Sequence, residues 1–183
     1  SSTAAVVAVL KELMKLHGNV VFGGDGYSEE WHKAAVEERG LKNIPTTADA
    51  LPALREESVK KLFESTGVLT PVELESRFEV YSEQYILSIE VEAKLVIEMA
   101  KSMVYPAAIQ NLNEISDASS KLVGMGIQLD NSVAKTIAEE ASAMMAAVSK
   151  LSEAMEKEDF GSTEEHMQFC ANTIRSLMDE VRS

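Results

Sequence analysis

Apolar residues in the second half of the chain recur at steps of three and four, the spacing of one helix face. The segment TPVE at 70–73 combines a threonine N-cap, a proline at the first helical position and a glutamate at the capping-box position. No stop signal follows until GMG at 124–126. The pattern predicts one helix of roughly 50 residues and about 80 Å. Pro106 should kink this helix, because it removes a backbone donor.

Two further helices are predicted after the long one. Asp130 is expected to cap the first of them, and FGSTEE at 160–165 is a turn followed by a new cap. Short connections make neighbouring helices antiparallel, so residues 70–183 are predicted to form a three-helix bundle. The apolar positions alternate between steps of four and three, as in a heptad seam; they are Val133, Ile137, Ala141, Met144, Val148, Leu151 and Met155, and then Met167, Cys170, Ile174, Leu177 and Val181.

The first 69 residues have a different character, with short helices separated by loops. Helices are predicted over 4–17, from the N-cap Ser28 to Gly40, and over about 55–65. VVF at 20–22 is expected to be extended, and Thr47 to cap a short turn.

The predicted fold class is all-α. A short-helix region, residues 1–69, precedes an antiparallel three-helix bundle, residues 70–183, with one very long, Pro-kinked helix. Because that helix is longer than its partners, part of it should pack on residues 1–69 or on another chain.

Composition narrows the range of partners. The chain has 183 residues, enough for one medium domain with or without an appendage, and only 5% of them are aromatic. The net charge is −13, which repels phosphate backbones and anionic membrane surfaces. We therefore expect neither nucleic acid nor membrane as a partner.

Location and redox chemistry follow from what the sequence lacks. No stretch reaches the ~20 apolar residues of a membrane span, and the start SSTAAVVAVLKEL lacks the basic residues of a signal peptide. A cytoplasmic location is expected. The single cysteine, Cys170, cannot form an internal disulfide or a structural zinc site, and its core spacing favours a packing role. The start without methionine, close to a helix, indicates a piece of a longer protein.

The glycine-rich turn Gly23–Gly26 raises the question of a ligand site. It is neither a Walker loop nor a G-x-G-x-x-G motif. Glycines before a helix can expose N–H groups to an anion, but Glu29 and Glu30 already place negative charge there. Asp25 lacks the spaced oxygen ligands of a calcium loop. A tight chain reversal is favoured, and the function of the turn stays open.

Other candidate residues also favour structural roles. His17, His32 and His166 lie on separate elements without metal-ligand spacing. Glu90 and Lys94 form an ordinary i,i+4 pair. The sequence therefore predicts no catalytic and no metal-binding residue, and it leaves cofactor-binding residues unknown.

Two further features have a structural and a functional interpretation each. Glu92 falls near the seam of the long helix, where burial is costly for an unpaired carboxylate, and is expected to pair with Arg77 or Arg55. Met144, Met145 and Met155 would form either a hydrophobic groove or, as we favour, part of the core.

Long ordered motifs resemble the C-terminal part of the type III glutamine synthetases. They are NVVFGGDGYSEEWHKAAVEERGLKNIPTTADALPAL and VKKLFESTGVLTPVELESRFEVYSEQYILSIEVEAKLVIEMAKSMVYPAA, which together cover roughly residues 18–108. The specific signatures are the GDGYSEEW turn, the TTADALP connector, LFESTGVLT and ESRFEVYSEQY. Residues 109–183 suit the helical tail of that family but carry no distinctive motif.

The resemblance implies a parent enzyme, a glutamate–ammonia ligase that uses ATP and magnesium or manganese and forms two-ring oligomers. Its metal-binding carboxylates and phosphate-binding residues would lie upstream, so none is assigned here. The last elements of its catalytic domain would end near Ala93. We expect this chain to complete that fold and to add a helical bundle for subunit assembly or regulation. Alone it should be inactive, with the upstream catalytic domain and neighbouring subunits as partners in a homo-oligomer.

Two alternatives belong to other functional classes. One is a free-standing helical adaptor or oligomerisation module that binds partner helices through the seams at 133–155 and 167–181. The other is a small-ligand sensor with a pocket between residues 1–69 and the long helix. Self-association is also predicted, because apolar surface made to face an upstream domain would be exposed.

Overall fold

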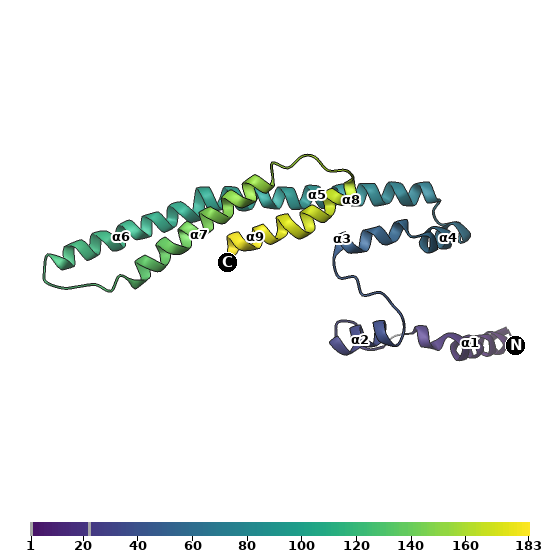
Figure 1. Ribbon diagram of the computed structural model, residues 1–183. Helices are drawn as coiled ribbons and strands as arrows, with labels where there is room; N and C mark the ends of the chain where they lie inside the picture. The colour runs from purple at the N-terminus through teal and green to yellow at the C-terminus, as the bar shows by residue number, and fades with distance from the viewer. Residues whose placement is uncertain (1, 22) are drawn as a thin grey trace. The chain divides into compact units, whose positions relative to one another are not determined.

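The chain folds into helices that group into two compact units, Ser1–Pro45 and Thr46–Ser183. The computed structural model describes residues 2–21 and 23–183 (Figure 1). Over these residues every regular element is helical and there is no strand, which confirms the all-α fold class. Within the same residues no helix has the length and apolarity to cross a bilayer.

The first unit contains α1 (Ser2–His17), the 3-10 turn η1 (Gly18–Val20) and α2 (Glu29–Glu37). Ser28 caps α2 as predicted, because its hydroxyl accepts the N–H of Trp31 at 3.2 Å. Gly40 follows α2 with a φ of 65°, which lets the N–H of Leu41 reach the carbonyl of Ala35. The predicted extended VVF stretch is wrong at Val20, which belongs to η1; Val21 is extended, and Phe22 lies outside the described residues.

The second unit begins with α3 (Thr47–Ala50), η2 (Leu51–Arg55) and α4 (Glu57–Ser65). Thr46, not Thr47, caps α3, because the Thr46 hydroxyl accepts the N–H of Asp49. All three elements contact α5 (Pro71–Met99). By contact these short elements therefore belong with the long helix, while the sequence-based division at 69 and 70 stays a prediction.

The long helix is continuous from Pro71 to Val123, as α5, a π-helical turn η3 (Ala100–Val104) and α6 (Tyr105–Val123). Its start is the predicted capping box: the Thr70 N–H donates to Glu73 Oε2 at 2.8 Å, and the Glu73 N–H donates to Thr70 Oγ1 at 3.3 Å. The Thr70 N–H and the Thr70 hydroxyl both donate to Glu73 Oε2, at 2.8 Å each, and these two bonds lower the pKa of Glu73.

A π-helical turn precedes Pro106, the residue at which the sequence predicts a kink. Pro106 has no N–H to offer an i−4 carbonyl, and its ring crowds that carbonyl. The preceding residues adopt wider turns, in which the N–H of Tyr105 donates to the carbonyl of Ala100. The helix thus passes the proline without ending.

A loop with Gly126 at positive φ reverses the chain into α7 (Ser132–Ala154). Asp130 is not the N-cap as predicted: that position is Asn131, without a side-chain bond. The Asp130 carboxylate instead accepts the N–H and hydroxyl of Ser132, at 3.0 and 2.9 Å, which lowers the pKa of Asp130. The last helix runs through α8 (Thr163–Phe169), a second π-helical turn η4 (Cys170–Ile174) and α9 (Arg175–Arg182).

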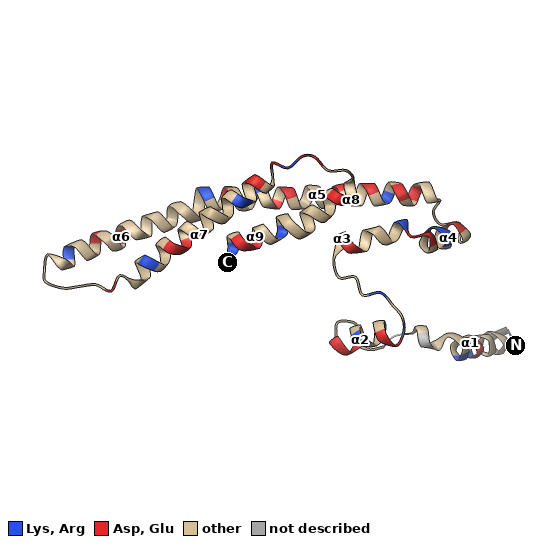
Figure 2. Ribbon diagram, viewed as in Figure 1, with Lys and Arg blue, Asp and Glu red and all other residues tan. Residues whose placement is uncertain are grey.

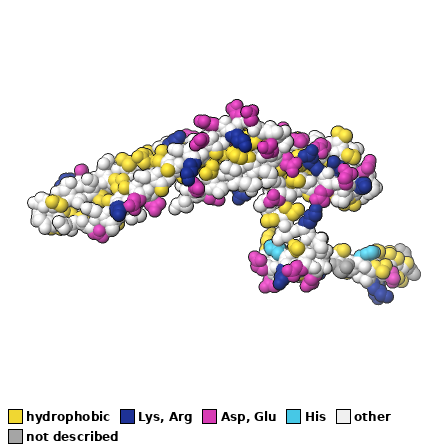
Figure 3. All heavy atoms as spheres, in the orientation of Figure 1, with side chains coloured by type: hydrophobic (Ala, Val, Ile, Leu, Met, Phe, Trp, Pro, Cys, Tyr) yellow, Lys and Arg dark blue, Asp and Glu magenta, His cyan; other side chains and the backbone are white. Residues whose placement is uncertain are grey.

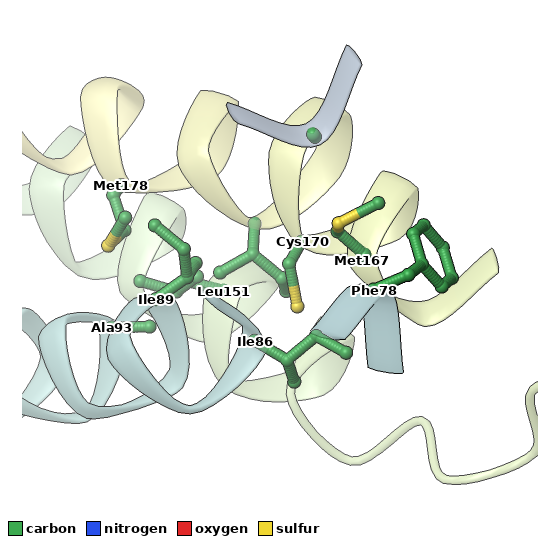
Figure 4. Close-up of a cluster of buried hydrophobic side chains, with 10 residues drawn as sticks. Phe78, Ile86, Ile89, Ala93, Leu151, Met167, Cys170 and Met178 are labelled. Carbon is green, nitrogen blue, oxygen red and sulfur yellow. The ribbon is translucent and has the colours of Figure 1, made fainter. Parts of the chain in front are cut away.

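The core of the second unit lies where α5, α7 and the last helix meet (Figure 4). The predicted seam is buried at Ala141, Val148 and Leu151, but Val133 is 60% exposed. Buried side chains from these helices and from α3 form one cluster: Ala48, Phe78, Ile86, Ile89, Ala93, Leu151, Met167, Cys170, Ile174 and Met178.

Candidate functional site

The glycine turn is organised by its own residues. The Tyr27 N–H donates to Asp25 Oδ1 at 2.9 Å, and the Ser28 hydroxyl donates to the Asp25 carbonyl at 3.1 Å. Since Ser28 also caps α2, the turn leads the chain directly into that helix. Glu29 and Glu30 occupy the first turn of α2, as the sequence predicts. These contacts support a chain reversal at Gly23–Gly26.

The three histidines lie on separate elements. His17 ends α1 and is exposed, while His32 in α2 and His166 in α8 are half-buried. No group of three His, Cys, Asp or Glu side chains within residues 2–21 and 23–183 is arranged to hold a metal ion.

His166 has a partner that sequence reasoning missed. Its Nε2 lies 3.3 Å from Glu90 Oε1, so Glu90 pairs across the bundle with α8 instead of with Lys94 on its own helix. Phe160 stacks on the His166 ring, with centroids 4.0 Å apart and 9° between the planes. The pair and the stack attach the connection before α8 to α5. Because Glu90 and His166 are far apart in sequence, their contact can be predicted only when the packing of α8 against α5 is known.

Arg55 forms a second polar contact between elements. Its guanidinium lies 3.0 Å from Glu75 on α5 and 3.1 Å from Glu164 on α8, and it sits over the Phe78 ring at 4.6 Å. The predicted pairing of Glu92 is wrong, because Glu92 is exposed and Arg55 pairs with the other two carboxylates. Arg77, its other expected partner, donates to the Tyr81 hydroxyl at 3.3 Å.

Cys170 packs in the core as predicted, with 1% of its surface exposed. Burial, together with the nearby Glu90 carboxylate, raises the pKa of the Cys170 thiol to about 11. A neutral buried thiol is a poor nucleophile. Cys170 therefore acts as a core residue.

A pocket of ≈ 550 Å³, called here the apolar pocket, lies beside the end of α9. Met144 lines this pocket, whereas Met155 packs against the core cluster. One methionine therefore lies in a groove and another belongs to the core. Other side chains around the pocket come from four helical segments and include Val96, Val104, Ala108, Ile137 and Glu140.

Exposed apolar side chains occur on α1, along α5 and at the connection between α6 and α7. On α1, apolar residues fill about half of the helix circumference at roughly 100° per residue, and Val6, Leu10, Leu13 and Met14 are 48–57% exposed. Another group lies at the hairpin tip, defined as residues 123–133, where α6 connects to α7. Surfaces of this kind are typical of sites that bind another protein segment.

Comparison with known proteins identifies the family. The glutamine synthetase C-terminal domain family matches residues 5–122, from the first turn of α1 to the end of α6. The chain belongs to this family. The match extends the resemblance seen in the sequence at both ends, to α1 and to most of α6.

Two relatives align over nearly all of this glutamine synthetase C-terminal domain. The type-3 glutamine synthetase of Dictyostelium discoideum is 32% identical over 192 residues, with 100% of this chain covered. A glutamine synthetase of Butyrivibrio fibrisolvens is 33% identical over 183 residues, with 97% covered. In both cases the chain spans only 26% of the relative's length. It corresponds to the C-terminal region of these proteins.

Proposed function

We propose that this domain is a structural and assembly region of a type III glutamine synthetase, a cytoplasmic ATP-dependent ligase that joins ammonia to glutamate. The family match supports this function over a free-standing adaptor. In the longer protein, ATP and magnesium or manganese would bind to residues upstream of this domain. The domain itself would supply helices that complete the catalytic fold and hold subunits together.

The observation that carries the proposal is the uncovered apolar face of α1. Val6, Leu10 and Leu13 are 54%, 53% and 48% exposed on a helix whose polar residues, Lys11 and Lys15 among them, lie on the other side. An amphipathic helix gains most of its stability from packing that face. The family match begins at residue 5, inside this helix. The upstream catalytic region is the proposed cover.

The experiment places Leu10→Asp and Leu13→Asp together in the longer protein. Because a carboxylate at either position disfavours burial, we expect loss of assembled protein and at least a tenfold fall in ATP-dependent glutamine formation. Lys11→Asp with Lys15→Asp, on the polar face of the same helix, is the matched control. Unchanged assembly and activity in the Leu10 and Leu13 variant would reject the proposed role of α1.

A further inference from the structure

An apolar stripe runs along α5 on the side away from the core. It is called here the α5 stripe and consists of Val80, Leu87, Val91 and Leu95, which are 47–61% exposed. At roughly 100° per residue these side chains fall within about 80° of the helix circumference, opposite the side that buries Phe78. One face of α5 thus packs in the bundle, and the other presents apolar side chains outward.

A groove of ≈ 470 Å³ borders this stripe and shares Leu87 with it. The groove lies between α5 and the connection from α7 to α8, and it is called here the acidic groove. Its lining combines apolar and acidic side chains; among them are Ile86, Leu87, Phe160, Glu83, Glu90 and Glu158. Figure 3 shows hydrophobic and acidic side chains next to one another over this part of the molecule. A cavity of this size can hold several side chains of a partner.

Two of the three carboxylates in the groove are unpaired. Glu90 contacts His166 at 3.3 Å, but neither Glu83 nor Glu158 is in an ion pair within residues 2–21 and 23–183. Between residues 80 and 95, α5 has three glutamates and one lysine, and residues 155–160 have three carboxylates and one lysine. Figure 2 shows acidic residues on both segments. The groove is therefore a site of negative charge.

The two lysines beside the groove do not neutralise it. Lys157 Nζ lies over the rings of Phe160 and Phe169, at 4.8 and 4.7 Å from their centroids. Lys94 follows Glu90 by one helical turn on α5. Neither lysine lines the groove, so its carboxylates remain available to a cation from outside.

The unpaired carboxylates favour a partner that binds and dissociates. Permanent cover by packed helices would remove Glu83 and Glu158 from water, which is costly for carboxylates without partners. Apolar side chains bordered by charged ones are typical of interfaces with a solvated rim, whereas permanent interfaces are more apolar. The face of α1 is of the second kind, because its lysines lie on the other side of that helix. The acidic groove therefore suits a separate protein.

We propose that the acidic groove and the α5 stripe bind a basic amphipathic helix of a separate protein. The apolar residues of that helix cover Leu87 and Val91. Its lysine or arginine heads pair with Glu83 and Glu158, while the stem of such a side chain packs on Phe160. This inference goes beyond the proposed assembly function, because it assigns a binding surface and the chemistry of its partner.

The first test titrates the 183-residue chain with a labelled helical peptide of about 18 residues, made of leucine at helical spacing and lysine elsewhere. Fluorescence anisotropy should show binding, and the same peptide with glutamate for lysine should not bind. Glu83→Gln with Glu158→Gln should raise the dissociation constant about tenfold or more at low salt. Absence of binding by the wild type would overturn the proposal.

The matched control removes the same charge at another place. Glu37→Gln with Glu38→Gln changes two exposed carboxylates at the end of α2 and should leave the dissociation constant within about twofold. Equal weakening by the two pairs would show that the peptide is attracted only by the overall negative charge, and would reject the groove.

The second test concerns the apolar contact. Leu87→Gln with Val91→Gln should weaken peptide binding about tenfold or more, because both side chains lose apolar contact area. Val72→Gln is the control, since Val72 is 79% exposed at the start of α5, outside the stripe. An unchanged constant in the Leu87 and Val91 variant would contradict the proposed surface. So would light scattering that shows a dimer of the chain which this variant dissociates, because a second copy would then occupy the stripe.

The third test repeats the titration on a longer glutamine synthetase that contains this domain. Peptide binding should persist there with a dissociation constant within about threefold of that of the chain alone. Binding to the chain without binding to the longer protein would show that another part of the enzyme fills the groove, and would overturn the proposal. The α1 variants are scored by assembly and glutamine formation instead, so the failure of one proposal can be told from the failure of the other.

Discussion

At the scale of single residues, the main role of the polar side-chain contacts is to connect helices. Glu90 and His166 connect α5 to α8, and Arg55 connects η2 to both. These pairs are a quarter or more exposed, so each contributes little to stability. Cys170 is the residue whose ionisation the fold changes most clearly, because its thiol is enclosed by the core.

Ionisation of Cys170 should lower the stability of the fold at alkaline pH. Its pKa rises from 9.0 in the unfolded chain to about 11 in the fold, so its contribution to stability is complete below pH 9 and is lost as the pH approaches 11. Two pKa units correspond to about 2.7 kcal/mol at most. Chemical denaturation at pH 8 and pH 11 should show the wild type losing about 1–3 kcal/mol more than Cys170→Ala. Equal losses would contradict this account of Cys170.

At the scale of elements, the sequence predicted helices well where local signals are strong. The capping box at Thr70 and the cap at Ser28 depend on neighbouring residues alone, and both are present. Positions set by tertiary context were missed. Val133 fits the heptad spacing but is 60% exposed, and after the π-helical turn η4 Met178 is buried while the predicted Leu177 packs against the core partly buried. A π-helical hydrogen-bonding pattern cannot be recognised from the spacing of apolar residues in the sequence alone.

The capping box should contribute measurably to the long helix. Thr70→Ala removes the oxygen that accepts the Glu73 N–H, and such caps are worth about 1 kcal/mol. We expect that loss in the free energy of unfolding from urea denaturation. The control is Thr136→Ala, whose hydroxyl donates to the Ser132 carbonyl on an exposed helix surface and should change stability by under about 0.5 kcal/mol. Equal effects of both substitutions would argue against the box.

The seam between α5, α7 and the last helix should dominate stability. Leu151 is fully buried in the core cluster, so Leu151→Ala should cost about 2–5 kcal/mol in urea denaturation. Leu95→Ala is the matched comparison on α5, because Leu95 is 51% exposed, and it should cost about 1 kcal/mol or less. Similar losses at both positions would show that the core lies elsewhere.

At the scale of the whole molecule, the domain combines a packed core with apolar side chains that stay exposed on several helices. The core explains how the second unit folds, while the α1 face and the hairpin tip lie outside it. The sequence predicted that apolar surface would remain exposed, but it did not show which residues would carry that surface. Local sequence patterns predict helices, but which apolar faces remain exposed depends on where other helices pack against them.

The most direct measurement is ammonia-dependent formation of glutamine from glutamate and ATP, made in parallel on this chain and on a longer glutamine synthetase that contains it. Our account assigns these residues a structural role, with the reactive groups supplied by other parts of the enzyme. It predicts turnover by the longer protein and none by the chain alone. Sustained glutamine formation by the 183-residue chain would contradict it.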